Sequence, residues 1–166
     1  MQTIILETEI AVPAERCFLL SLNIDLHMES AALSRERAIA GVTHGLIGLG
    51  ESVTWRGRHF GLMLTHETRI TKYERPHYFQ DTMVRGAFSS FVHNHYFKPH
   101  NENETLMRDE LHFVAPLGPL GRLAERLLLR QYLIRFLVER NRTIREVAEG
   151  PEAIRSRYLP GYRPAN

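Results

Sequence analysis

Two histidines separated by one residue are the residues of this sequence best placed for chemistry. His93 and His95 lie in the segment Phe91-Val-His-Asn-His-Tyr-Phe97, whose aromatic and β-branched residues predict a strand. Residues two apart on a strand point to the same face, so the two imidazoles should lie next to each other. Because an imidazole titrates near neutral pH, such a pair is suited to proton transfer.

Two aspartates on neighbouring strand-like segments can complete an acid–base site. Asp81 and Asp109 each alternate with apolar residues in their segments, and a carboxylate that contacts an imidazole orients it and raises its basicity. This chemistry would fit enolisation, cyclisation or dehydration of a polyketide-like substrate. The alternative is a structural network that fixes the strand register without turnover. The predicted set consists of Asp81, His93, His95 and Asp109.

A metal ion or a nucleotide cofactor is a weaker interpretation of these residues. The histidine pair would need a third ligand for zinc, from His59, Asp81 or Asp109, and the sequence alone does not bring these together. The glycine-rich segment 41–50 lacks the Gly-Lys-Ser/Thr of a phosphate-binding loop and the parallel βαβ setting of a dinucleotide site. We therefore predict no metal and no cofactor, and interpret segment 41–50 as a turn.

The elements that position these residues follow from hydrophobic periodicity. Residues 3–10 alternate like a half-buried strand, and Pro13 is suited to begin a helix. Short strands with short connections predict an antiparallel meander. The predicted elements are helices at 14–22 and 25–33 and strands at about 35–40, 51–59, 62–72, 78–85, 91–99 and 105–114. Asp25 is expected near the start of the second helix, where its carboxylate can accept free N–H groups.

A long C-terminal helix is predicted by apolar residues at helical spacing, including Leu120, Leu123, Leu127, Leu133, Leu137, Ile144 and Ala148. Gly150-Pro151 should end this helix. Its arginines, Arg140 among them, are expected on a solvated face. The prediction is one α+β domain over residues 1–150, with a curved seven-stranded sheet around the helix and an extended tail over 151–166.

The inward face of the predicted sheet has an unusual composition. Placing the more apolar alternate positions inside also places His93, His95, Asp81 and Asp109 there. Buried carboxylates and imidazoles are costly unless they pair, so either they pair in a dry core or they line a cavity. A mostly apolar cavity with a few polar groups is typical of a ligand site. The expected ligand-binding side chains are Trp55, His59, Phe79, Met83, Phe91, Phe97, Met107 and Phe113.

Composition limits the possible partners. The chain of 166 residues has a formal net charge of only +2, and its basic residues are spread along it, which argues against nucleic acid. We expect no stable membrane insertion, because no apolar run approaches the roughly 20 residues needed to span a bilayer. Cys17 lies in an apolar segment and is expected to be a buried, inert thiol. A cytoplasmic location and a possible homodimer are further expectations.

Several motifs in this order resemble the helix-grip or SRPBCC superfamily, which contains START lipid-transfer domains, birch-pollen-type allergens and bacterial polyketide cyclases. Glu9-Ile-Ala-Val-Pro13-Ala-Glu15-Arg-Cys-Phe18 is similar to the opening strand and helix of that family, and Gly45-Leu-Ile-Gly48-Leu-Gly50-Glu-Ser-Val53-Thr-Trp55 to its glycine loop and third strand. The segments Asp81-Thr-Met83, His93-Asn-His95 and Thr105-Leu-Met107-Arg-Asp109 resemble a bacterial subgroup. The resemblance covers residues 1 to about 148.

The resemblance implies an internal cavity between sheet and helix that commonly binds lipids, quinones, polyketides or other flat apolar molecules. It implies no single activity, because function depends on the site and not on the fold. Three hypotheses follow: a binder of a small apolar ligand, a cofactor-independent cyclase or dehydratase that uses the aspartates and histidines, and a protein-interaction module whose cavity is vestigial.

Overall fold

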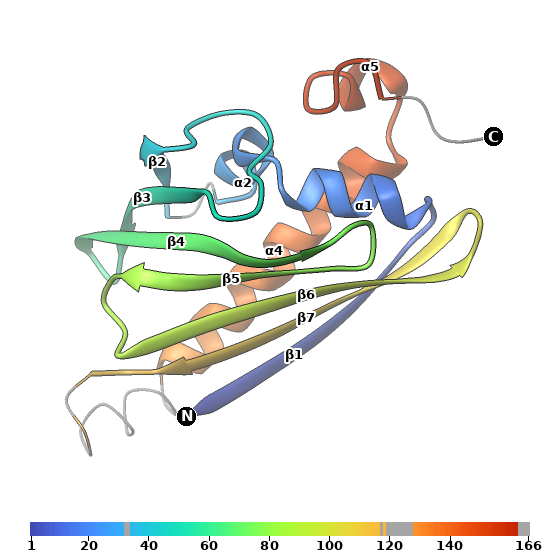
Figure 1. The fold of residues 1–166 in the computed structure, drawn as a ribbon. Helices are drawn as coiled ribbons and strands as arrows, with labels where there is room; N and C mark the ends of the chain where they lie inside the picture. Colours follow the sequence, from blue (N-terminus) through green and yellow to red (C-terminus); the bar gives the residue numbers. More distant parts are fainter. Residues whose placement is uncertain (32–33, 117, 119–127, 163–166) are drawn as a thin grey trace.

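The computed structural model describes residues 1–166 except 32–33, 117, 119–127 and 163–166. A long helix, α4, crosses one face of a curved sheet, and two short helices cover one end of it (Figure 1). The elements in the described part of the chain are β1 (Gln2–Ile10), α1 (Ala14–Ser21), α2 (Ile24–Ser30), β2 (Arg37–Gly41), β3 (Ser52–His59), β4 (Leu62–Glu74), β5 (Tyr78–Arg85), β6 (Ser90–Asn101), β7 (Glu104–Val114), α4 (Arg130–Glu149) and α5 (Glu152–Arg155). This is the predicted α+β helix-grip architecture.

The sheet is a single antiparallel one with the strand order β1-β7-β6-β5-β4-β3-β2 among the described residues. Asp81 on β5 lies opposite His93 on β6, and His95 lies opposite Asp109 on β7. The β6–β7 ladder keeps its register up to Pro99, so no bulge exchanges the two faces of β6 near the histidines. The predicted inward face is therefore the observed one, and it brings both aspartates next to both histidines.

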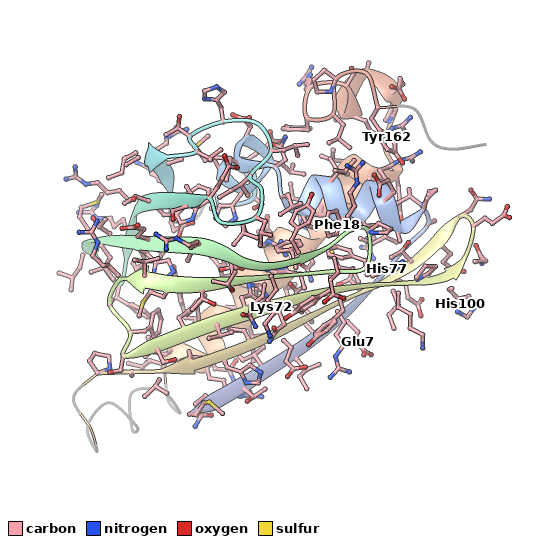
Figure 2. The ribbon with its side chains drawn as sticks, viewed as in Figure 1. Glu7, Phe18, Lys72, His77, His100 and Tyr162 are labelled. Atoms are coloured by element: carbon pink, nitrogen blue, oxygen red, sulfur yellow. The ribbon has the colours of Figure 1, made fainter. Side chains whose placement is uncertain are left out.

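The core is formed where α4 and α1 pack on the sheet. Leu133, Leu137, Ile144 and Ala148 of α4 are buried, as their helical spacing predicts. The predicted helical residues Leu120, Leu123 and Leu127 lie outside the described residues. Phe18 of α1 is fully buried and meets the rings of Tyr73, Phe79 and Phe97 edge to face, and in Figure 2 it lies between α1 and the sheet.

Two local predictions require correction. The start of α2 is capped by Asn23, whose side chain accepts a hydrogen bond from the Leu26 amide, because Asn23 occupies the non-helical position before the first turn. Asp25 lies inside that turn and instead accepts a hydrogen bond of 2.8 Å from the Gly45 amide. The carboxylate thus anchors the glycine-rich segment to α2.

The described part of the segment after residue 150, residues 151–162, is not extended as predicted. It contains the helix α5 and then places Leu159 in the hydrophobic core, with 5% of its surface exposed. The Asn23 side chain donates a hydrogen bond of 2.9 Å to the Tyr158 carbonyl. Tyr158 and Tyr162 are partly buried against the same core cluster, which contains residues of α1 and α2. No helix in the described part of the chain is long and apolar enough to cross a membrane.

A matched pair of leucines tests the core assignment. Leu20 of α1 is 1% exposed and Leu62 at the start of β4 is 64% exposed. We expect Leu20→Ala to lower the free energy of unfolding by about 2–5 kcal/mol, because it removes buried methyl groups and leaves a cavity. Leu62→Ala should change it by less than about 0.5 kcal/mol. Urea unfolding followed by circular dichroism measures both, and equal effects of the two substitutions would contradict this core.

Candidate functional site

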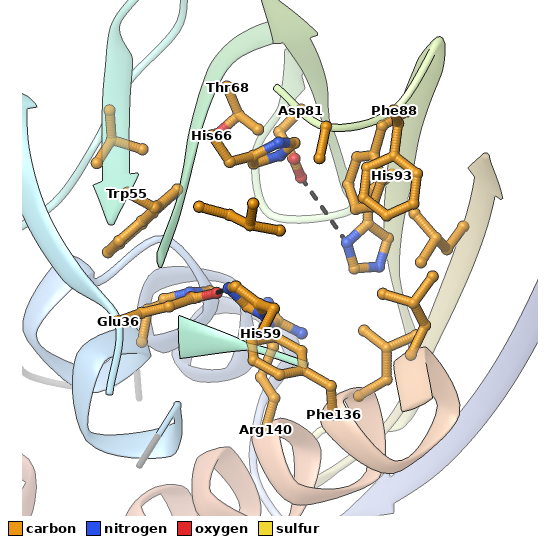
Figure 3. A pocket seen from close by; sticks show the side chains of 18 of the residues that line it. Glu36, Trp55, His59, His66, Thr68, Asp81, Phe88, His93, Phe136 and Arg140 are labelled. Atoms are coloured by element: carbon orange, nitrogen blue, oxygen red, sulfur yellow. Dashed lines mark hydrogen bonds and ion pairs between the residues drawn. The ribbon is translucent and has the colours of Figure 1, made fainter. Parts of the chain in front are cut away.

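A mostly apolar cavity of about 430 Å³ lies between the sheet and α4. Aromatic residues contribute much of its wall, and several polar side chains interrupt that wall at two places. In Figure 3, Glu36 and His59 lie on one side of the hollow, and Asp81 and His93 lie on the other. The aromatic lining residues are Trp55, Phe60, Phe79, Phe88, Phe91, Tyr132 and Phe136.

Most of the predicted site residues lie on this wall. Three of the predicted ligand-binding residues instead belong to the packed core: Phe97 and Met107 lie beneath α1 and Phe113 lies next to Leu133 of α4, all at 1% exposure or less. Alternation places them on the inward face, but the helices fill the space above them. Met83 is half-buried near the end of β5 and is not on the cavity wall. The predicted residues that do line the cavity are Trp55, His59, Phe79, Asp81, Phe91, His93 and His95.

The first polar place, here called the aspartate–histidine cluster, comprises Asp81, His93, His95 and Asp109. His95 Nε2 is hydrogen-bonded to Asp81 Oδ2 at 2.9 Å, and its Nδ1 lies 3.0 Å from Asp109 Oδ1. His93 Nε2 lies 2.9 Å from the same Asp109 oxygen, and its Nδ1 lies 3.9 Å from Asp81 Oδ2. Each imidazole therefore lies between the two carboxylates, as the register of β5, β6 and β7 requires.

Arg140 of α4 completes this cluster, although the sequence analysis placed it on a solvated face. Its guanidinium is buried at 5% exposure and donates to Asp109 Oδ1 over 3.3 Å, while Asn141 donates to Asp109 Oδ2 over 2.7 Å. Position 140 continues the buried stripe of Leu133, Leu137 and Ile144. The helical spacing of position 140 therefore predicts burial, but the charge of arginine led to the prediction of a solvated side chain.

Burial and neighbouring charges shift the pKa values of the aspartates and of His93 in this cluster. Burial alone would raise the pKa of Asp109, but the adjacent imidazoles of His93 and His95 and the charge of Arg140 outweigh burial and hold the pKa well below its ordinary range. The pKa of Asp81 is also lowered, because its hydrogen bond with His95 and its electrostatic interactions with both imidazoles and with Arg140 outweigh the effect of burial. Burial, with the neighbouring His95, lowers the pKa of His93 to about 4. At neutral pH His93 is thus a neutral imidazole facing two carboxylates.

The second polar place, here called the Glu36 cluster, comprises His27, Glu36, His59 and Tyr132. His27 Nε2 donates a hydrogen bond of 2.9 Å to Glu36 Oε2, and His59 Nε2 lies 3.2 Å from Glu36 Oε1. His59 Nδ1 is hydrogen-bonded to the Tyr132 hydroxyl at 2.6 Å. Burial alone would raise the pKa of Glu36, but the two imidazoles lower it to about 2. A carboxylate, two imidazoles and a phenol therefore form one connected chain on the cavity wall.

Sequence reasoning found only His59 of this second cluster. Glu36 precedes β2, and His27 and Tyr132 lie on α2 and just inside α4, where strand alternation gives no guidance. His66 on β4 also lines the cavity without having been predicted, and burial lowers its pKa. The buried Cys17 lies apart from the wall; burial raises its pKa to about 12, so the thiol remains protonated at neutral pH.

No protein-family model matches this sequence, and no curated protein matches it. The fold does match solved structures. The Zhui aromatase/cyclase from Streptomyces sp. R1128 is 12% identical, with 98% of this chain and 99% of that chain covered and a TM-score of 0.72. A START superfamily protein from Mycobacterium smegmatis is 12% identical, with 83% and 92% covered and a TM-score of 0.63.

A third match is norcoclaurine synthase from Thalictrum flavum, solved in complex with dopamine and hydroxybenzaldehyde. It is 12% identical, with 86% of each chain covered and a TM-score of 0.61. At these identities the likeness shows the fold. It is the helix-grip fold, as the sequence motifs predicted.

The buried pair of Asp109 and Arg140 should be a major source of stability. Asp109→Asn removes the charge that compensates the buried guanidinium, and we expect it to lower the free energy of unfolding by about 3–5 kcal/mol. The control is Glu139→Gln, which breaks the ion pair with Arg142 on the outside of the same helix and should cause no measurable change. Chemical unfolding of both variants provides the measurement, and a neutral Asp109→Asn would contradict the assigned role.

Glu36 should give stability a specific dependence on pH. Its pKa falls from 4.5 to about 2 on folding, so the unfolded chain binds more protons in that interval. The stabilisation is complete above pH 4.5 and is lost as the pH falls toward 2. The difference in unfolding free energy between wild type and Glu36→Gln should therefore shrink over this interval. A difference that stays constant, or one that the exposed control Glu102→Gln reproduces, would refute this coupling.

Proposed function

We propose that the protein binds a small, flat, mostly apolar molecule in the cavity between the sheet and α4. The observation that carries this proposal is the volume of about 430 Å³ behind a largely apolar wall, within the range of small-molecule sites. A filled core would leave no such space, because protein interiors are close-packed. The two polar clusters give the ligand hydrogen-bonding partners at separate places.

The chemistry of the wall defines the class of ligand. Trp55, Phe79 and Phe91 offer ring faces and edges on which a planar molecule can pack. The Tyr132 hydroxyl and the His93 imidazole are polar groups at different parts of the wall, suited to carbonyl or hydroxyl oxygens. An aromatic or polyketide-like compound with oxygen substituents fits this pattern better than an unsubstituted hydrocarbon. The solved complex of norcoclaurine synthase with two small aromatic compounds supports this choice of class.

The cavity also favours ligand binding over the interaction-module hypothesis. That hypothesis requires the inner polar residues to pair tightly and leave no volume. They do pair, but their pairing occurs in the wall and leaves the cavity open.

A second candidate function is a cofactor-independent cyclase or dehydratase. It is favoured by His93, a neutral imidazole on the cavity wall within 4 Å of two carboxylates. In this role His93 would take a proton from a carbon next to a ligand carbonyl, and Asp109 would stabilise the imidazolium that forms. Asp109 also supports the fold through Arg140 and Asn141. His93→Gln is therefore a better test of chemistry than any change at Asp109.

Binding can be tested with the fluorescent apolar probe anilinonaphthalene sulfonate (ANS). Leu133 of α4 lines the cavity, whereas Val138 lies on the outside of the same helix at 47% exposure. We expect Leu133→Trp to weaken saturable binding of ANS at least about tenfold, because the indole occupies the ligand volume. Val138→Trp should leave the binding unchanged. Circular dichroism checks that both variants fold, and equal affinities in two folded variants would contradict binding in this cavity.

The enzyme hypothesis is tested by comparing the molecules that two proteins retain. Wild type and His93→Gln are purified in parallel from the same host, and their organic extracts are compared by mass spectrometry. If His93 catalyses a dehydration, the variant retains a compound heavier by one water than the compound retained by wild type. If the protein only binds its ligand, both extracts contain the same molecule.

A further inference from the structure

The inner edges of the aspartate–histidine cluster converge on one point of the cavity wall. Asp81, His93 and His95 each contribute one potential ligand atom, and these atoms all lie within 4.8 Å of one another. Asp81 Oδ2 lies 2.9 Å from His95 Nε2 and 3.9 Å from His93 Nδ1. Donor atoms on one zinc ion, at bond lengths of about 2.1 Å, lie roughly 3.3 Å apart. Small side-chain rotations therefore bring the three atoms around one ion.

The outer edges of the same two imidazoles converge on a carboxylate. His93 Nε2 and His95 Nδ1 lie 2.9 and 3.0 Å from the same oxygen, Asp109 Oδ1. A histidine that binds a metal through one nitrogen almost always presents the other to a carboxylate, carbonyl or water, which fixes the orientation of the ring. Asp109 is fully buried and is held in place by Arg140 and Asn141. Its position is therefore that of an outer carboxylate behind two ligand histidines.

A second observation concerns the hydrogen bonding of the His93 imidazole. Its Nε2 is buried and makes no hydrogen bond among the residues that the structure describes, although it lies 2.9 Å from Asp109 Oδ1. A buried polar atom without a partner is costly. A small rotation of the ring would direct Nε2–H at Asp109 and Nδ1 at the point shared with Asp81 and His95. One movement would thus satisfy the orphaned atom and complete the ligand set.

We propose that Asp81, His93 and His95 form a binding site for a divalent transition-metal ion such as Zn²⁺ or Co²⁺. Two imidazoles and one carboxylate are the ligand set that suits these borderline ions. The two carboxylates of the cluster, Asp81 and Asp109, outnumber its one guanidinium, Arg140, which favours a cation at this point. Three protein ligands leave at least one coordination position open.

The open position faces the cavity, because all three ligand residues lie on its wall. A carbonyl, phenol or carboxylate oxygen of a bound organic molecule could occupy that position. The site would thus select oxygen-bearing ligands from among flat apolar molecules. This selection deepens the proposed binding function and rests on it, but metal binding itself can be measured without any organic ligand.

The test is equilibrium dialysis of the tag-free full chain against Zn²⁺, with the bound metal counted by elemental analysis. We expect one tightly bound Zn²⁺ per wild-type chain, and at least about tenfold weaker binding in His93→Gln and Asp81→Asn. The matched control is His100→Gln, which changes an exposed histidine at the far end of the β6–β7 hairpin (Figure 2) and should keep the full affinity. Co²⁺ supplies a second readout, because its visible absorption reports the geometry of nitrogen and oxygen ligands.

The site is overturned if wild type binds no Zn²⁺, or if His93→Gln and Asp81→Asn bind it as wild type does. Thermal unfolding of each variant shows whether a loss of metal binding reflects a loss of fold. Because the two substitutions lie on separate strands, the test still holds if one of the two variants does not fold. ANS binding by the metal-free protein is measured in parallel. Retention of ANS without Zn²⁺ binding would refute the metal site alone, whereas loss of both would refute the cavity as well.

Discussion

Asp109 is a fully buried carboxylate, and the arrangement of the site depends on how its charge is compensated. Arg140 and Asn141 reach it from α4, and His93 and His95 reach it from β6. Removing a carboxylate from water is affordable only when its oxygens are paired. The resulting contacts join the long helix to the central strands at a fixed position. They also hold two imidazoles at the cavity wall, so one electrostatic requirement links the stability of the fold to the geometry of the site.

The cavity lies between two regions of close apolar packing. Phe18 and its aromatic neighbours fill one end of the space between helices and sheet, and Phe113 with Leu133 and Leu137 fills another region. Between these two clusters the space is open, and its wall is lined by side chains of β3, β4, β5 and α4 and carries the two polar clusters. Hydrogen bonds from Arg140 and Asn141 to Asp109 and from His27 to Glu36 hold these clusters in place, and buried contacts of this kind rigidify their surroundings. The wall is therefore shaped before any ligand arrives, which reduces the entropy lost on binding.

The fold was largely predictable from the sequence, and the site only in part. Alternation identified the strands and the inward faces of β5, β6 and β7, which bring Asp81, His93, His95 and Asp109 together. Alternation cannot tell which inward side chains a helix will cover, so Phe97, Met107 and Phe113 were expected at the cavity but lie in the core. Arg140 was missed because its charge was given more weight than its helical position. Glu36 was missed because no inward face was assigned to the strand predicted at 35–40, and His27 because it lies on a short helix, where no strand pattern applies.

Native mass spectrometry of the freshly purified protein tests the central claim, that the cavity holds a small organic molecule. The intact mass is measured under native conditions and again after denaturation, for wild type and for the cavity-filling variant Leu133→Trp. The account predicts an added organic mass on native wild type that disappears on denaturation and is absent from the variant. An added mass of equal abundance on both proteins would contradict it, because the molecule would then be bound outside this cavity.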